Sequence, residues 1–207
     1  MLARFPAVLT GVALAACSVV GVREAEEPNF QVAARVGAVE VRQYGPRIAA
    51  ETTVASDEMG ARSAGFRRLA GYIFGDNRSR DTIAMTAPVA QQLETIAMTA
   101  PVAQARDASG TWVIRFFMPA TYTMETLPQP LNPEVKLVAV PGEIVAVLRF
   151  SGSTAPKAVR ARQTELLQTL QGSAWQPDGA VVAWFYDPPW TLPPFRRNEV
   201  AVPVTRR

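Results

Sequence analysis

The segment VEVRQYGPRIAAETTV, residues 39–54, decides the fold, because it holds two short apolar runs separated by Gly45-Pro46. Val39 and Val41 alternate with polar residues, the period of two that is typical of a half-buried strand. Glycine followed by proline ends a strand. We therefore predict strands over residues 39–44 and 48–54.

The same arrangement returns in the second half of the chain as VKLVAVPGEIVAVLRF, residues 135–150, at a constant offset of 96 positions. This offset places Pro141-Gly142 on Gly45-Pro46. It predicts strands over residues 135–140 and 144–150, and it indicates that the domain arose by duplication.

A helix is predicted after each strand pair. The first covers residues 57–74, with Ser56 as N-cap and Gly75 at the C-terminal end. Its expected apolar side carries Met59, Phe66, Leu69 and Ile73, with Arg62 on the same side and Arg67 and Arg68 turned away from its centre. The second helix starts near Ser153 or Thr154, with Pro156 in its first turn, and stops at Gly172.

A direct repeat of ten identical residues, TIAMTAPVAQ, occupies positions 82–91 and 95–104. Proline in mid-segment predicts that each copy is an extended piece at a sheet edge or bulge. Further strands are expected over residues 30–36, 111–118, 180–186 and 199–204.

These elements predict an α+β domain over residues 29–207, in which each half reads strand, strand, helix, strand. Two such halves can join their sheets into a distorted, antiparallel-rich β-barrel with two helices packed on it. An architecture of this kind leaves a cleft between a helix and the mouth of the sheet, where a small apolar ligand can bind.

The N-terminus has the layout of a secretory signal, with Arg4 followed by an uncharged run to Ala16. Leu14-Ala-Ala-Cys17 resembles the bacterial lipobox, in which the cysteine is lipidated and becomes the new N-terminus. The alternative is a chance cysteine beside an ordinary cleavage site. We expect a signal peptide over residues 1–16 and a lipidated tether over 17–28. Ser18 in place of aspartate favours the outer membrane, facing the periplasm.

The composition excludes several kinds of chemistry. The chain has no histidine and Cys17 is its only cysteine, so histidine catalysis, histidine metal sites and cysteine clusters are excluded. We find no paired carboxylates in an apolar stretch and no phosphate-binding glycine loop, so we predict no catalytic residues. The net charge of +3 is spread along the chain, which argues against a nucleic-acid partner. All but two of the basic residues are arginine, which suits a carboxylate-bearing ligand.

Several blocks, in the right order, resemble the SOUL family of haem-binding proteins. They are Val39 to Tyr44, Gly65 to Gly75, the two IAMTAPV segments, Phe116 to Pro119 ahead of Tyr122-Thr123, Tyr186-Asp-Pro-Pro189, and Arg196 to Val200. Together they extend over nearly the whole domain. The resemblance implies a distorted barrel with two helices and a shallow apolar groove beside the first helix that accepts haem or another tetrapyrrole.

For this chain, the resemblance implies that the macrocycle lies against Phe66, Leu69 and Ala70 while Arg62 and Arg67 bind the propionates. Some family members use a histidine ligand to the iron, which this chain lacks. Met85 and Met98 are possible thioether ligands, although strand methionines more often fill a core. Core packing is an equally natural role for Phe66 and Leu69.

Two other kinds of function stay open at this point. One is an enzyme on the same scaffold, such as a small-molecule hydrolase or a metal-removing enzyme, which would need a buried carboxylate beside the cleft. The other is an envelope protein-interaction module that uses the proline-rich loop up to Pro194.

Overall fold

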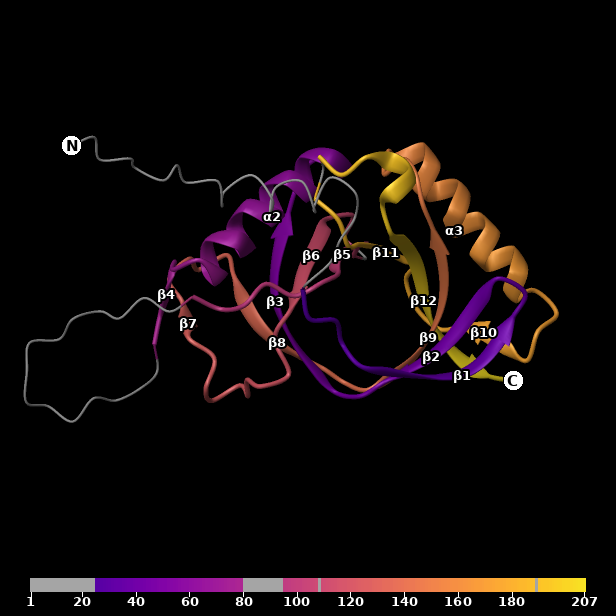
Figure 1. Cartoon of the computed structure of the whole chain (residues 1–207), viewed down its shortest axis with the longest axis horizontal. Helices are drawn as coiled ribbons and strands as arrows, with labels where there is room; N and C mark the ends of the chain where they lie inside the picture. The colour runs from indigo at the N-terminus through magenta and orange to yellow at the C-terminus, as the bar shows by residue number, and fades with distance from the viewer. Residues whose placement is uncertain (1–24, 80–94, 108, 189) are drawn as a thin grey trace, which may run out of the picture.

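A computed structural model describes residues 25–79, 95–107, 109–188 and 190–207 (Figure 1). Its elements follow in chain order: β1 (Phe30–Val36), β2 (Val39–Tyr44), β3 (Arg47–Val54), α2 (Glu58–Ile73), β4 (Asn77–Arg78), β5 (Val102–Arg106), β6 (Trp112–Phe117), β7 (Gln129–Pro130), β8 (Lys136–Val140), β9 (Glu143–Phe150), α3 (Pro156–Leu170), β10 (Trp175–Pro177), β11 (Val182–Phe185), η1 (Pro193–Phe195) and β12 (Asn198–Arg206). Most predicted elements are present within one or two residues of their expected bounds.

One antiparallel sheet of ten strands organises the domain, in the order β1-β2-β9-β12-β11-β5-β6-β3-β8, with β10 paired to β12. The predicted α+β class and the two helices are confirmed. Among the described residues the sheet curls but does not close into a barrel, so that part of the prediction is wrong. Closure fails because no strand of this part of the chain pairs with the outer edge of β1 or of β8.

The two duplicated strand pairs form the bend of this curl. Tyr44 pairs with Glu143 at the end of the β2–β9 ladder, and Arg47 pairs with Val140 at the start of the β3–β8 ladder, in an unbroken register. Pro46 and Pro141 interrupt the two strands at this point, and proline cannot donate to a sheet ladder. The two prolines therefore bend both strands at the same point.

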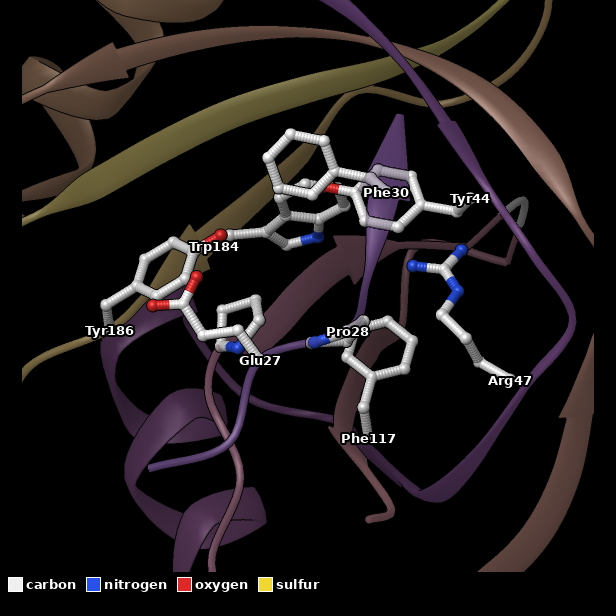
Figure 2. A pocket seen from close by; sticks show the side chains of 9 residues that line it. Glu27, Pro28, Phe30, Tyr44, Arg47, Phe117, Trp184 and Tyr186 are labelled. Atoms are coloured by element: carbon white, nitrogen blue, oxygen red, sulfur yellow. The ribbon is translucent and has the colours of Figure 1, made fainter. Parts of the chain in front are cut away.

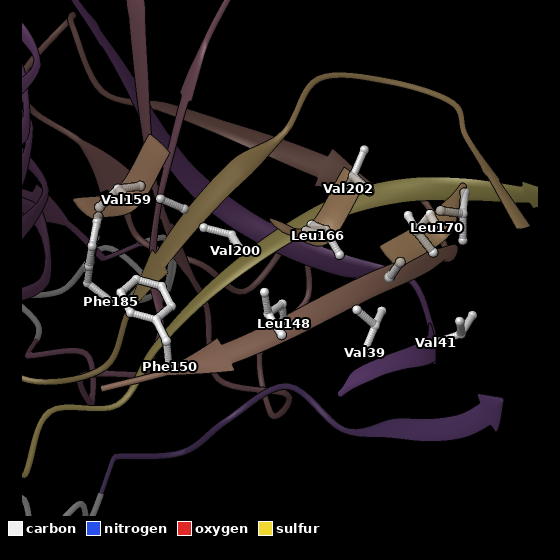
Figure 3. Packing of buried hydrophobic residues seen from close by; sticks show 13 residues of the cluster. Val39, Val41, Leu148, Phe150, Val159, Leu166, Leu170, Phe185, Val200 and Val202 are labelled. Carbon is white, nitrogen blue, oxygen red and sulfur yellow. The ribbon is translucent and has the colours of Figure 1, made fainter. Parts of the chain in front are cut away.

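The helices cover the outer, convex face of the curl (Figure 1). α2 packs on β3 and β6, whereas α3 packs on β9 and β12. Figure 3 shows the cluster beneath α3, where Val159, Leu166 and Leu170 meet the buried side chains of the sheet. The opposite, inner face has its own apolar cluster: Tyr44, Ala49, Ala103, Phe117, Val145, Val147, Trp184 and Ala201. The central strands are thus apolar on both faces.

The ends of both helices follow from local chemistry. Asp57, and not the predicted Ser56, is the N-cap of α2, because its side chain accepts a 2.7 Å hydrogen bond from Gly60 N. α3 starts at Pro156 after Ala155, whose N–H is bonded by Ser153 Oγ at 3.1 Å. Gly75 and Gly172 follow the helices at φ values of 131° and 74°, which glycine adopts readily.

The second copy of the direct repeat corrects another prediction. Its end forms β5, which lies inside the sheet between β6 and β11 and not at an edge. Pro101 stands just before the first strand residue, Val102, where the ladder needs no donor. The proline therefore excludes only the start of the segment from the sheet. The first copy lies outside the described residues.

Gly65 marks the closest approach of α2 to the sheet. A Cβ at this position would lie 2.8 Å from Ile114 Cβ and closer still to Cγ1. We expect Gly65→Ala to lower the free energy of unfolding by about 1–3 kcal/mol, since overpacking outweighs the gain of up to about 1 kcal/mol in helix propensity. Urea unfolding followed by circular dichroism measures this change.

Gly71→Ala in the same helix is the matched control. Its Cβ would meet only the end of the Asp76 side chain, which can rotate away. We expect this variant to be as stable as the wild type or slightly more so. Equal stability of the two alanine variants would contradict the close packing of α2 on β6.

Candidate ligand-binding surfaces

An exposed apolar flank runs along α2 and is called the α2 stripe here. It consists of Met59, Phe66, Ala70 and Phe74, spaced so that a helix brings them to one side. Met59 is 48 % exposed, Phe66 40 % and Phe74 59 %. The Phe66 ring makes an edge-to-face contact with Phe116, with ring centroids 5.3 Å apart. Because these side chains flank the buried face, they extend the apolar surface of the helix into solvent.

Two arginines border the α2 stripe and differ in their surroundings. Arg62 is largely buried: it donates to Gln104 Oε1 at 2.7 Å and Thr154 O at 3.2 Å, and lies 3.9 Å from the Phe185 ring centroid. Burial lowers its pKa, partly offset by the nearby Glu58 carboxylate. Its Nη2 has no hydrogen-bond partner. Arg67 is exposed on the other border.

The structure brings four of the five predicted ligand residues to this flank. Phe66 and Ala70 belong to the stripe, and Arg62 and Arg67 border it. Leu69 is fully buried in the cluster beneath α2, so it has no surface to offer a ligand in this conformation. The expected core role is thus observed for Leu69 and Ile73, whereas Met59 and Phe66 reach the surface.

A second candidate site lies on the inner face, where sequence reasoning did not place one. We call it the inner pocket. Its cavity of about 10 Å³ is lined by Glu27, Pro28, Phe30, Tyr44, Arg47, Pro101, Phe117, Trp184 and Tyr186 (Figure 2). A cavity this small has room for about one water. One feature of the sequence indicates that the inner face of the sheet is covered: the unbroken apolar run 144–148 predicts a strand that is buried on both faces.

A buried ion network joins the inner pocket to the sheet. Glu199 is completely buried, yet its carboxylate accepts hydrogen bonds from Arg42 at 2.9 and 3.2 Å and from Arg197 at 3.0 and 3.2 Å. Tyr186 donates a further bond of 2.6 Å. These donors come from β2, from the residue after β11 and from the residue before β12. The buried carboxylate is therefore fully compensated.

The network shifts the pKa of its members. Burial raises the pKa of Tyr186, and the negative charge of Glu199 raises it further. Burial also raises the pKa of Tyr44, against the opposing effect of Arg42. Burial alone would lower the pKa of Arg42, but the bonds and charge of Glu199 outweigh it and raise this pKa. Both tyrosines therefore stay neutral, and both arginines around Glu199 stay charged.

A larger groove of about 290 Å³ adjoins the inner pocket on the same face and shares Phe117 and Trp184 with it. Polar side chains at this groove are Arg106, Asp107, Arg115 and Glu143. Glu143 also pairs with Arg47 of the inner pocket. The two spaces are thus neighbours.

Among the described residues, no group of three or more histidine, cysteine, aspartate or glutamate side chains could hold a metal ion. Within the same residues, no helix combines the length and apolar character needed to span a bilayer.

The curled sheet, the two outer helices and the covered inner face define the protein as an α+β domain with one exposed and one enclosed candidate site. The model of the SOUL heme-binding protein family matches residues 25–203, so the chain belongs to this family. The resemblance predicted from the sequence is confirmed. No curated protein sequence is significantly similar to the chain.

Solved structures share the fold at low sequence identity. The crystal structure of the EcmrR C-terminal domain superposes with a TM-score of 0.59 and 9% identity, covering 86% of this chain and 99% of that one. In a cryo-EM complex of EcmrR with DNA the TM-score is 0.58 at 10% identity, covering 82% and 57%. A hydrolase from Listeria innocua gives 0.50 at 12% identity, covering 84% and 94%. These likenesses concern the fold alone.

Proposed function

We propose that this protein binds haem or a related tetrapyrrole reversibly against the α2 stripe, without catalysing a reaction. Membership of a heme-binding family supports the class of ligand. The observation that carries the location is the exposed apolar stripe between two arginines. A flat macrocycle would cover Phe66, Ala70 and their neighbours and remove apolar surface from water.

Arg67 is the main candidate for a ligand propionate. It is exposed and has no ion pair among the described residues. A charge-assisted hydrogen bond contributes about 1.5–3 kcal/mol, which is roughly tenfold or more in affinity. Arg62 can add one donor, its Nη2, which makes no hydrogen bond and lies 3.7 Å from Glu58 Oε1, while its other contacts hold α2 to β5 and to the loop before α3.

The iron contributes little in this proposal, because the chain has no histidine to ligate it. Affinity then rests on the macrocycle and its carboxylates. Metal-free protoporphyrin IX should therefore bind within about threefold of hemin. A strong preference for hemin would instead indicate an iron ligand, and Met59 in the stripe would be the first candidate.

We expect hemin titration of the soluble domain, residues 18–207, to shift the Soret band and quench tryptophan fluorescence. Arg67→Ala should weaken binding about tenfold, whereas the adjacent Arg68→Ala should not, since Arg68 is engaged with Glu134 at 2.9 Å and Thr53 O at 3.0 Å. Phe66→Ala should weaken binding about threefold to tenfold through lost apolar contact. Val32→Ala, which removes an exposed apolar side chain on β1, is its control.

Two results would reject this proposal. The first is a titration with no change in either the Soret band or the fluorescence. The second is an equal effect of the two arginine variants, which would show that general surface charge, and not a site beside α2, attracts the ligand.

We further propose that the mature protein is lipid-anchored through Cys17 to the outer membrane, facing the periplasm. This proposal rests on the sequence, because Cys17 lies outside the described residues. Labelled palmitate should appear on the wild-type protein and not on Cys17→Ser. Absence of label from the wild type, or its persistence on the variant, would disprove the anchor.

A further inference from the structure

The inner pocket is closed by the chain itself. Residues 25–29, called the strap here, cross it before β1 begins, and Glu27 and Pro28 line it (Figure 2). Glu26 fixes the strap at one side: its backbone O accepts from Ala100 N and its Oε1 from Ala120 N, both at 2.9 Å. The strap thus fills space that the aromatic walls would otherwise leave open.

Glu27 places a carboxylate in this site. Arg197 Nη1 donates to both of its oxygens, at 2.8 and 2.9 Å. Arg42 and Arg197 both face Glu199, but Arg42 has a second carboxylate partner in Glu40, whereas the second partner of Arg197 is Glu27. Without Glu27, Arg197 Nη1 would lose both of its hydrogen bonds, and a ligand carboxylate could accept from this charged donor in a largely apolar setting.

Arg47 supplies a second, unused donor. Its side chain is only 9% exposed, and its guanidinium lies 4.5 Å from the Tyr44 ring centroid and 4.7 Å from that of Phe117. Glu143 bonds one end of the guanidinium, but the buried Nε has no hydrogen-bond partner. A buried donor without a partner costs free energy that an acceptor would recover. Figure 2 shows Glu27 and Arg47 on opposite sides of the pocket, with aromatic rings between them.

We propose that the inner pocket is a binding site for a small aromatic carboxylate and that the strap is its built-in competitor. The ligand carboxylate takes the place of Glu27 on Arg197. Its ring replaces Pro28 among Tyr44, Phe117 and Trp184. A second acceptor at the far end of the ligand, such as a phenol or carbonyl oxygen, satisfies Arg47 Nε. This site and its ligand are separate from the α2 stripe and from the tetrapyrrole.

The dimensions agree with competition. The closed cavity of about 10 Å³ admits no organic ligand, so the strap must leave first. The Glu27 side chain is 31% exposed, so water screens its ion pair with Arg197 and a ligand carboxylate can compete for the arginine. The adjoining groove of about 290 Å³ gives a longer ligand room to extend past Phe117 and Trp184.

The test compares 2-naphthoate with its neutral isostere 2-naphthamide by isothermal titration of the soluble domain. Glu27→Ala should tighten 2-naphthoate binding at least fivefold more than it tightens 2-naphthamide binding. Glu26→Ala loosens the strap without releasing Arg197, so it should change both probes alike. Arg197→Gln in the Glu27→Ala background should remove the preference for the carboxylate.

Two kinds of result would contradict the proposed carboxylate site. If Glu27→Ala leaves 2-naphthoate binding unchanged, or tightens both probes equally, the carboxylate site does not exist. Phe66→Ala separates this site from the tetrapyrrole surface, because it should not change 2-naphthoate binding. Loss of 2-naphthoate binding in Phe66→Ala would overturn the assignment to the inner pocket. If Arg197→Gln does not fold, the two probes on Glu27→Ala still decide the question.

Discussion

Glu199→Ala is expected to lower the free energy of unfolding by about 3–5 kcal/mol, because it removes the fully buried carboxylate that both Arg42 and Arg197 face and leaves each arginine with only a partly exposed one. The Arg42 side chain is 5% exposed and that of Arg197 is 14% exposed, and both direct two hydrogen bonds at Glu199. Tyr186 would also lose its acceptor. Urea unfolding monitored by circular dichroism gives the change in free energy.

Glu40→Ala provides the matched control, since it removes a carboxylate that also bonds Arg42 but is 29% exposed. We expect it to cost about 1 kcal/mol or less. The double variant Arg42→Leu/Glu199→Leu should be more stable than Glu199→Ala, because it removes both charges together. A cost below about 1 kcal/mol for Glu199→Ala would show that water reaches the network.

Stability should also fall steeply above pH 10, because the folded protein keeps Tyr44 and Tyr186 neutral. Burial raises the pKa of both above the ordinary value of 10.0. The unfolded chain then loses phenolic protons that the folded state retains, so alkali favours unfolding. The contribution is complete below pH 10 and is lost as the pH rises towards the folded-state pKa.

For Tyr186 this loss reaches about 1.4 kcal/mol by pH 11, and Tyr44 adds to it in the same direction. Urea unfolding at intervals from pH 8 to 11 measures the slope. Tyr186→Phe should be less stable than the wild type at pH 8, since the bond to Glu199 is lost, but its stability should depend less on pH above 10. A slope that this substitution leaves unchanged would show that Tyr186 ionises in the folded protein at its ordinary pKa.

Local pattern was sufficient for the elements of secondary structure. The alternation around Val39 and Val41, the breakers at Gly45-Pro46 and Pro141-Gly142, and the glycines after the helices set bounds that the structure reproduces closely. The duplication was also visible, because both strand pairs keep one offset. Such features depend on neighbours within a few residues, and so a sequence displays them directly.

Local pattern was not sufficient to predict which residues of α2 are exposed. Helical spacing placed Met59, Phe66, Leu69 and Ile73 on one side, but it could not fix the angle at which α2 meets the sheet. Close packing at Gly65 sets that angle, burying Leu69 and leaving Met59 and Phe66 in solvent. The exposed stripe is therefore a property of helix packing.

Taken alone, the sequence determined the family, the two helices, nearly all the long strands and the absence of histidine chemistry. Only the tertiary structure decided that the sheet curls without closing, that β5 lies within it, and that Glu27 reaches Arg197 across 170 positions. It also enclosed Glu199 and left Arg47 Nε without a partner. The reason is physical: periodicity and capping are local, whereas these contacts depend on strand order and on the bend of the sheet.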